Sequence, residues 1–306
     1  MAGREAGYGL AKPLSITRII RVGNIFRRPV TPATAPPRHP AAGRVVQSVA
    51  PREDLTVPAS VCTTAELDVQ AVNAQLDDAP AQRVVAWAHE TFGSSLVMTS
   101  SFGAQSAVSL HLVTRVVPDI PVIFIDTGYL FPETYRFALE LEQRLKLNLK
   151  VYTPRVTTGW LEAVHGKLWE QGPEALDKYL QIVKVEPMQR AMNELGAKAW
   201  IAGLRREQTR HRANLRRVEL QDGRCKIHPI LDWSTKQVHD YLKQHELPYH
   251  PLYEKGYASI GDVHSTRPIT EQQHEREGRF GGLRQECGLH LPTSAEENQS
   301  RESSGL

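Results

Sequence analysis

Cysteine is scarce in this chain, with three residues among 306, at positions 62, 225 and 287. Their wide spacing matches neither a disulfide framework nor a zinc-binding pattern. Long hydrophobic runs are also missing, because no apolar stretch approaches the roughly 20 residues that a membrane-spanning helix needs. We therefore expect a protein without membrane spans, in a reducing compartment where thiols stay free, which favours the cytoplasm.

Acidic residues are almost absent from the start of the chain. Residues 1–52 carry nine lysines and arginines but one acid, Glu5. The whole chain has 37 basic and 34 acidic residues, so 28 basic and 33 acidic residues remain for the rest, a net charge of −5. An acidic body argues against general binding of nucleic acid.

Residues 1–55 also lack sustained hydrophobic periodicity and are rich in proline. Three interpretations are open: a disordered extension or upstream translated sequence, an Arg-rich mitochondrial or plastid transit peptide, and a basic arm that binds nucleic acid. The first is favoured, because this stretch has no apolar face to bury. The polar residues 293–306 are also expected to be disordered.

From about residue 66 onward, short apolar runs alternate with helical patterns. Buried strands are expected at residues 95–101, 121–126, 147–153 and 199–203. Helices are expected over residues 66–92, 108–116 and 186–195, from Pro132, and after a capping Ser234. Cys225 is assigned to a turn before a strand. This alternation predicts an α/β fold, a single Rossmann-like domain of three layers with a parallel sheet covered on both faces.

Two loops directly after predicted strands carry candidate ligand groups, because ligands of such sheets bind beyond the carboxyl ends of the strands. The first contains Ser100, Ser101, Gly103 and Gln105, small polar residues whose backbone N–H groups can approach an anion at a helix N-terminus. The second begins with Asp126, which is placed to hydrogen-bond a ribose or an adenine amine. The alternatives are an ordinary strand-to-helix turn and a capping acid.

A third loop carries a dense arginine cluster: Arg205, Arg206, Arg210, Arg212, Arg216 and Arg217. Guanidinium forks suit phosphate and sulfate oxygens because they donate two parallel hydrogen bonds. A solvated charged face is the alternative, but the density of the cluster directly after a buried strand favours an oxyanion site.

Cys287 lies in a polar stretch near the C-terminal end, with Arg284 and His290 close in sequence. Neighbouring cations lower the pKa of a thiol and favour the reactive thiolate. An incidental surface cysteine is the alternative.

Taken together and in this order, these features resemble assimilatory phosphoadenylyl-sulfate reductases. The resemblance runs from about residue 66 to His290, through TSSFGAQSAVSLHL, IDTGYLFPETYRF, LKLNLKVY, GKLWEQG, KVEPMQRAM, GLRREQ, RANL, YHPLY and ECGLH. It implies an adenine-nucleotide α-hydrolase-like fold, with a nucleotide-binding domain over residues 66–265 and a mobile catalytic segment over residues 266–292. Related ATP pyrophosphatases have an Asp where Gln105 stands, which argues against ATP splitting.

The family divides in two by cysteine content. One half reduces adenylyl sulfate and binds an iron–sulfur cluster through a Cys-Cys pair and a Cys-x-x-Cys pair, four thiolates in all. Those positions correspond here to residues 179–180 and 262–265, which contain no cysteine. The resemblance thus implies the half with no bound cluster, metal or cofactor, which prefers the 3′-phosphorylated substrate. Residues 273–279 look more like the cluster-bearing half, so reduction of adenylyl sulfate without a cluster is the alternative.

The resemblance also implies a mechanism. The Cys287 thiolate takes the sulfonate from 3′-phosphoadenylyl sulfate as an S-sulfonate, and reduced thioredoxin or glutaredoxin then releases sulfite. Substrate-binding roles fall on Ser100, Ser101, Gly103, Gln105, Asp126, Lys167, Arg205, Arg206, Arg212, Arg279 and His290. A homodimer is the family expectation. An adenylylating enzyme and a non-catalytic nucleotide sensor are more distant interpretations.

Overall fold

The computed structural model describes residues 67–270 and 278–280, all within the unit Pro58–Leu306. The predicted extension of residues 1–55 and the predicted tail of residues 293–306 lie outside the described residues, as do Cys62, Cys287 and His290. The predicted catalytic segment of residues 266–292 is described only at residues 266–270 and 278–280.

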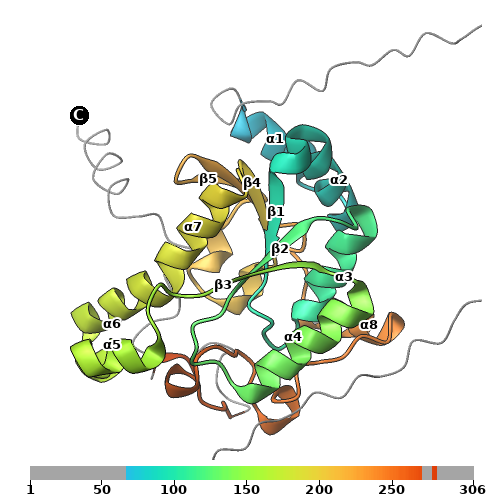
Figure 1. Cartoon of the computed structure of the whole chain (residues 1–306). Helices are drawn as coiled ribbons and strands as arrows, with labels where there is room; N and C mark the ends of the chain where they lie inside the picture. The colour runs from blue at the N-terminus through green and yellow to red at the C-terminus, as the bar shows by residue number, and fades with distance from the viewer. Residues whose placement is uncertain (1–66, 271–277, 281–306) are drawn as a thin grey trace, which may run out of the picture. The chain divides into compact units, whose positions relative to one another are not determined.

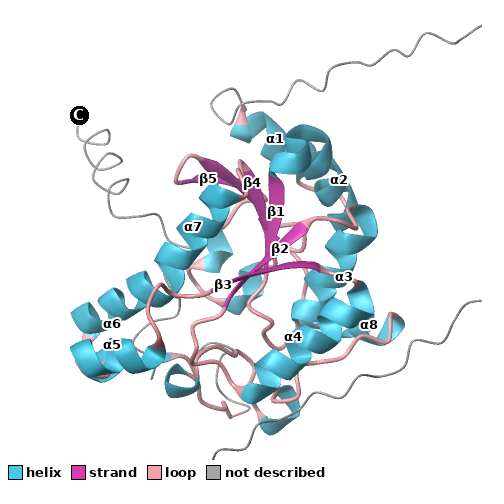
Figure 2. Cartoon of the chain, viewed as in Figure 1, coloured by secondary structure: helices cyan, strands magenta, loops and turns pink. Residues whose placement is uncertain are grey.

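A six-stranded sheet forms the centre of this unit (Figure 2). Its order is β3-β2-β1-β4-β6-β5, and all neighbours are parallel except the β5–β6 pair. The strands are β1 Leu96–Thr99, β2 Pro121–Ile125, β3 Asn148–Tyr152, β4 Ala199–Ala202, β5 Val218–Gln221 and β6 Arg224–Ile227. The first four confirm the predicted strands.

The β5–β6 hairpin was not predicted, and the assignment of Cys225 to a turn was wrong. Cys225 is a buried residue inside β6. The turn is formed by Asp222 and Gly223, whose φ angles of 51° and 70° suit the type I′ turn of a two-residue hairpin. Each strand has only four residues, and Arg224 and Lys226 give β6 a charged sequence, so its apolar pattern is too short to recognise.

Alternate residues of the central strands face opposite sides of the sheet. Leu96 and Met98 of β1 pack in one hydrophobic cluster, whereas Val97 packs in another. Because both faces are covered, the first three residues of β1 are all apolar and buried.

Helices cover both faces of the sheet (Figure 1). Side chains of α1 Val69–Leu76, α2 Ala81–Phe92, α3 Ser106–Val116, α4 Pro132–Leu145 and α8 Thr235–Gln244 join the first cluster. The other face packs against α7 Glu186–Glu194, and α5 Thr158–His165 and α6 Pro173–Leu180 build a separate hydrophobic cluster. The predicted three-layer α/β fold is confirmed.

Helix boundaries follow local sequence signals. The single helix expected over residues 66–92 was wrong: α1 ends at Leu76, and α2 starts after Pro80, which has no backbone N–H to continue a helix. Pro132 opens α4 as predicted. Ser234 caps α8 as predicted, because its side chain accepts from the Gln237 N–H while the Gln237 side-chain oxygen accepts from the Ser234 backbone N–H.

The connections contain several short helical turns, and one of them is unusual. Between α6 and α7 the chain forms a π-helix at Gln181–Val185, a rare turn that is frequent at functional sites. The 3₁₀ turns are Gly93–Ser95, Leu168–Glu170, Arg206–Gln208, Arg212–Asn214, Tyr253–Lys255 and Val263–Ser265.

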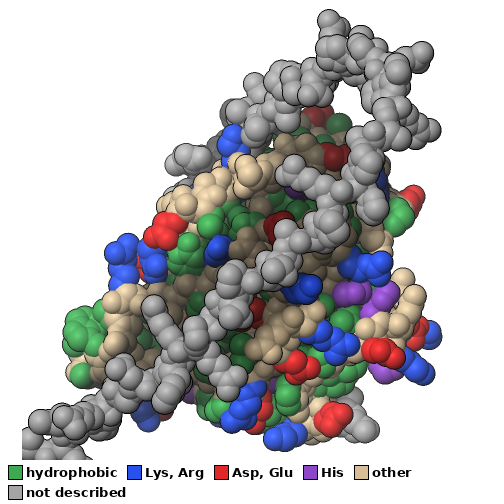
Figure 3. Space-filling view, turned by 45° about the vertical axis from the view of Figure 1, so that its right-hand side comes forward, with side chains coloured by type: hydrophobic (Ala, Val, Ile, Leu, Met, Phe, Trp, Pro, Cys, Tyr) green, Lys and Arg blue, Asp and Glu red, His purple; other side chains and the backbone are tan. Residues whose placement is uncertain are grey.

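The described part of the chain contains no helix that is both long and apolar enough to cross a membrane. In the space-filling view, acidic and basic side chains are interspersed with hydrophobic ones on the face turned to the viewer (Figure 3). This face therefore carries charges of both signs.

Two histidines have no exposed surface, His228 after β6 and His250 after α8. His228 Nδ1 lies 2.8 Å from the carbonyl oxygen of Arg216, which can only accept, so Nδ1 carries the proton. Burial lowers the pKa of His228 to about 3 and the pKa of His250 to about 4. Both side chains are therefore neutral in the folded protein at neutral pH.

We expect the free energy of unfolding to fall as the pH drops from about 6.5 to about 4.5. The unfolded chain binds a proton at each histidine below the ordinary pKa of 6.5, whereas the folded chain does not. Each buried histidine then costs up to about 1.4 kcal/mol per pH unit. Urea unfolding at a series of pH values measures the slope. His228→Gln should reduce it by about 1 kcal/mol per pH unit, and the exposed His89→Gln is the control. An unchanged slope in His228→Gln would contradict this account.

Candidate functional site

A cavity lies at the carboxyl ends of β1, β2 and β4. In the sheet order, β1 stands between β2 and β4, so the chain builds the sheet outward from β1 through β2 to β3 and then returns to the other side of β1 with β4. Ligands of open α/β sheets bind at this kind of switch point. The lining comes from the loop after β1, Thr127 after β2, residues 203–205 after β4, residues 258–261, and Arg279.

The loop after β1 contributes all four of its predicted residues, Ser100, Ser101, Gly103 and Gln105, to the cavity wall. Its shape depends on Phe102, which has a positive φ of 48° and a fully buried ring. The ring packs edge-to-face on Phe124, with centroids 4.9 Å apart. Because the phenyl ring is anchored in the core, the small polar residues on either side of it are left at the cavity, directly before the N-terminus of α3.

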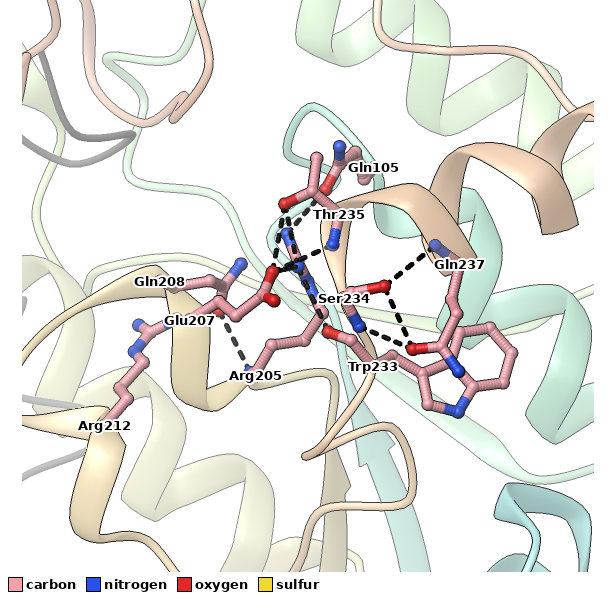
Figure 4. Close-up of polar contacts among 9 residues, drawn as sticks. All are labelled: Gln105, Arg205, Glu207, Gln208, Arg212, Trp233, Ser234, Thr235 and Gln237. Atoms are coloured by element: carbon pink, nitrogen blue, oxygen red, sulfur yellow. Dashed lines mark hydrogen bonds and ion pairs between the residues drawn. The ribbon is translucent and has the colours of Figure 1, made fainter. Parts of the chain in front are cut away.

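Arg205 lies at the centre of the site and is only 2% exposed (Figure 4). Its guanidinium donates to Gln105 Oε1 at 3.0 Å, to the Trp233 carbonyl at 3.3 Å and to Thr235 Oγ1 at 3.3 Å. It also pairs with Glu207 at 3.4 Å. Gln105, the residue that departs from the pyrophosphatase loop, is therefore a partner of a buried arginine.

Arg212 is the second buried arginine of the cavity, with 3% of its surface exposed. It donates to Gln208 Oε1, which also accepts a hydrogen bond of 3.1 Å from the backbone N–H of Arg205 (Figure 4). One amide oxygen thus links the side chain of Arg212 to the backbone of Arg205.

Three predicted residues lie outside the cavity lining. Arg206 pairs with Asp232 and donates to the Leu215 carbonyl. Lys167 is 55% exposed and lies 3.7 Å from Glu170. Asp126 accepts from Gly128 N and from the Tyr135 hydroxyl at 2.8 and 2.6 Å.

The arginines of the cluster after β4 also differ in whether they line the cavity. Arg217 is buried and donates to the carbonyls of Asp77 and Pro229 and, at 2.8 Å, to Asp232. Arg217 and Arg206 therefore brace the chain around Asp232, while Arg205 and Arg212 line the cavity.

Lys184 lines the cavity as well, and the sequence analysis missed it. It belongs to the π-helix, is 7% exposed, and its Nζ lies 2.7 Å from Oδ2 of the fully buried Asp262. The available signal was a single lysine between Val183 and Val185 in an otherwise apolar run. The predicted Arg279 also lines the cavity, and its guanidinium occupies the space beside Gly261 that a Cβ would need.

The positions that the resemblance aligns with cluster ligands lie together. Tyr179 is fully buried, and burial followed by the charge of Asp262 raises the pKa of its hydroxyl. The rings of Tyr179 and His264 meet at 5.1 Å, and His264 stacks on Trp169 at 3.8 Å. Among the described residues, no group of three or more His, Cys, Asp or Glu side chains is placed to bind a metal ion.

The chain was compared with known proteins. The phosphoadenosine phosphosulfate reductase domain matches residues 95–268. Relatives named phosphoadenosine 5′-phosphosulfate reductase include one from Synechocystis sp., 56% identical over 80% of this chain and 99% of its own length. Another, from Alkalilimnicola ehrlichii, is 55% identical over 76% of this chain and 94% of its own length.

A solved structure agrees with these sequence matches. The phosphoadenylyl-sulfate (PAPS) reductase from Candida auris, in complex with phosphate, is 34% identical with a TM-score of 0.58. The match covers 65% of this chain and 95% of that chain. The predicted family resemblance is confirmed. The chain belongs to the phosphoadenosine phosphosulfate reductase family.

Proposed function

We propose that this chain reduces 3′-phosphoadenylyl sulfate to sulfite and adenosine 3′,5′-bisphosphate, with Cys287 as the nucleophile. The observation that carries the proposal is the cavity at the switch point of the sheet, whose wall contains four mostly buried cations: Lys184, Arg205, Arg212 and Arg279. The names of the relatives support the same substrate.

The four cations can offset the repulsion between anions in the first step of the proposed reaction. A thiolate must approach an anionic sulfonate, and the leaving group is itself an anion. Fixed cations in a site shielded from water stabilise the charge that develops in such a transition state. Four cavity cations are therefore suited to this reaction, and the small polar loop of residues 100–105 is suited to the nucleotide phosphates.

Chain length supports the role of Cys287. Arg279 lines the cavity, and Cys287 follows eight residues later. Eight extended residues span at most about 28 Å, which bounds the distance between this thiol and the cavity. In the proposed step, the Cys287 sulfur bonds to the sulfonate sulfur while the S–O bond to the nucleotide breaks. Cys287 is left as an S-sulfonate.

A second thiol source must complete the cycle. A thiolate of reduced thioredoxin or glutaredoxin attacks the Cys287 sulfur, and sulfite leaves with the electron pair of the S–S bond. The second thiol of that partner then resolves the mixed disulfide, which frees Cys287 and oxidises the partner. The proposed enzyme needs no bound cluster or metal, and we further propose that it acts in the cytoplasm as a homodimer.

The nucleophile is tested by mixing the protein with 3′-phosphoadenylyl sulfate in the absence of reductant. We expect mass spectrometry to find one added sulfonate group on the Cys287 peptide. Cys287→Ser should lose this group and reduce sulfite release at least about 1000-fold, because a serine hydroxyl is not ionised at neutral pH. Cys62→Ser is the control and should behave like the wild type. Turnover retained in Cys287→Ser would remove the assignment.

The substrate is tested by comparing turnover of 3′-phosphoadenylyl sulfate with turnover of adenylyl sulfate, which lacks only the 3′-phosphate. The first should be the better substrate. The resemblance of residues 273–279 to the cluster-bearing half favours the alternative, adenylyl-sulfate reduction without a cluster, and equal or faster turnover of adenylyl sulfate would establish it.

Substrate contact is proposed for Ser100, Ser101, Gly103, Gln105, Arg205, Arg212 and Arg279, and it stays a prediction for Asp126, Lys167, Arg206 and His290. Arg212→Lys keeps the charge but loses the two-pronged donor, so we expect the KM of the substrate to rise about 10-fold. Steady-state kinetics of Lys167→Gln provide the comparison. An effect as large as that of Arg212→Lys would place Lys167 in the substrate site. No rise in KM for Arg212→Lys would exclude Arg212 from it.

A further inference from the structure

A buried carboxylate stands beside the cavity that the proposed function assigns to an anionic substrate. Asp262 has no exposed surface and follows Gly261, which lines the cavity. Its Oδ2 lies 2.7 Å from Lys184 Nζ, and its Oδ1 accepts from Thr127 Oγ1 at 2.7 Å. Lys184 and Thr127 both line the cavity. A negative charge at this point would weaken the binding of an anionic substrate. The presence of Asp262 therefore needs an explanation.

Backbone contacts hold Asp262 in place. Asp262 forms an isolated β-bridge with Leu130, and the next residue, Val263, donates its N–H to the Tyr129 carbonyl at 2.8 Å. The backbone N–H of Ser265 donates a hydrogen bond of 3.1 Å to the Asp262 carbonyl. The loop after β2 therefore fixes the position of Asp262 independently of Lys184.

The carboxylate stays ionised. Burial alone would raise the pKa of Asp262, but the charge of Lys184 and hydrogen bonds from Lys184 and Thr127 outweigh it and hold the pKa below its ordinary value. A buried ion pair is usually no more stable than apolar side chains of similar volume, so stability does not account for its presence. The pair does give the ammonium of Lys184 one fixed direction.

Arg279 is a second cation close enough for its charge to act on Asp262. It is 4% exposed and lies over Gly261. Two buried cations that line one cavity repel each other, and a nearby carboxylate offsets part of that repulsion. Asp262 engages one of the three donors of Lys184, so the ammonium retains others for a ligand in the cavity. Arg279 is also the cavity cation nearest to Cys287 in sequence, so the proposed function places the sulfonate at this end of the cavity.

We infer that Asp262 is a positioning residue that holds Lys184 toward the sulfonate of the substrate. This inference rests on the proposed function, because it presumes a nucleotide that carries a sulfonate. It predicts that Asp262 affects recognition of the sulfonate and not recognition of the rest of the nucleotide.

The test compares the affinities of 3′-phosphoadenylyl sulfate and adenosine 3′,5′-bisphosphate, which lacks the sulfonate. Both affinities are measured by calorimetry in the Cys287→Ser background, because this substitution prevents turnover of the substrate. Asp262→Asn keeps the shape and the acceptor for Thr127 but removes the charge. It should lower the ratio of the two affinities about 10-fold and leave bisphosphate binding within about twofold. The control is Asp240→Asn, which neutralises a carboxylate that is 54% exposed and paired with Lys236.

A second background tests whether Asp262 acts through Lys184. In Lys184→Met, the further change Asp262→Asn should not lower the affinity ratio again, because the group that it positions is gone. An unchanged ratio in Asp262→Asn, or equal weakening of both nucleotides, would overturn the inference and leave Asp262 a structural residue.

If Asp262→Asn does not fold, Thr127→Val replaces it. This variant removes the hydrogen bond to Asp262 Oδ1 with little change of volume and should lower the same ratio about threefold. An unchanged ratio there would also overturn the inference. Failure of the proposed function has a different signature, since wild-type protein would then gain no sulfonate on Cys287 whatever the state of Asp262.

Discussion

A buried guanidinium must find acceptors for its donors, and Arg205 imposes this requirement on the carboxyl edge of the sheet. Its acceptors come from the loop after β1, through Gln105, and from the start of α8, through Trp233 and Thr235. Segments more than 100 residues apart in sequence are therefore joined at one side chain. The cavity wall is rigid because the arginine that lines it also holds its parts together.

The same requirement explains why the arginines after β4 divide into two groups. Arg206 and Arg217 satisfy their donors with Asp232 and with backbone carbonyls, and they stabilise the chain outside the cavity. The Arg205 guanidinium donates to the amide oxygen of Gln105 and pairs with Glu207, and the Arg212 guanidinium donates to the amide oxygen of Gln208. Neutral amide acceptors orient a guanidinium without cancelling its charge.

Much of this arrangement could be read from the sequence, because it depends on local signals. Apolar runs marked β1 to β4, Pro132 and Ser234 marked helix starts, and loops after strands marked the cavity. The contact of Lys184 with Asp262 could not be read, since it joins a π-helix to a loop 78 residues later and neither segment has a periodic pattern. The roles of Arg206 and Arg217 were hidden for the same reason, because Asp232 is a partner only in the folded chain.

The two carboxylates near the cavity then have a common physical explanation. Four cations close together would repel one another before any substrate arrived, and the folded state would be strained. Glu207 beside Arg205 and Asp262 beside Lys184 offset part of that repulsion. Asp262 does so from behind Lys184, because it is wholly buried and contacts the cavity-lining residues Lys184 and Thr127. The donors are oriented before binding, so a substrate anion meets an arranged set of dipoles and charges and does not have to order them itself.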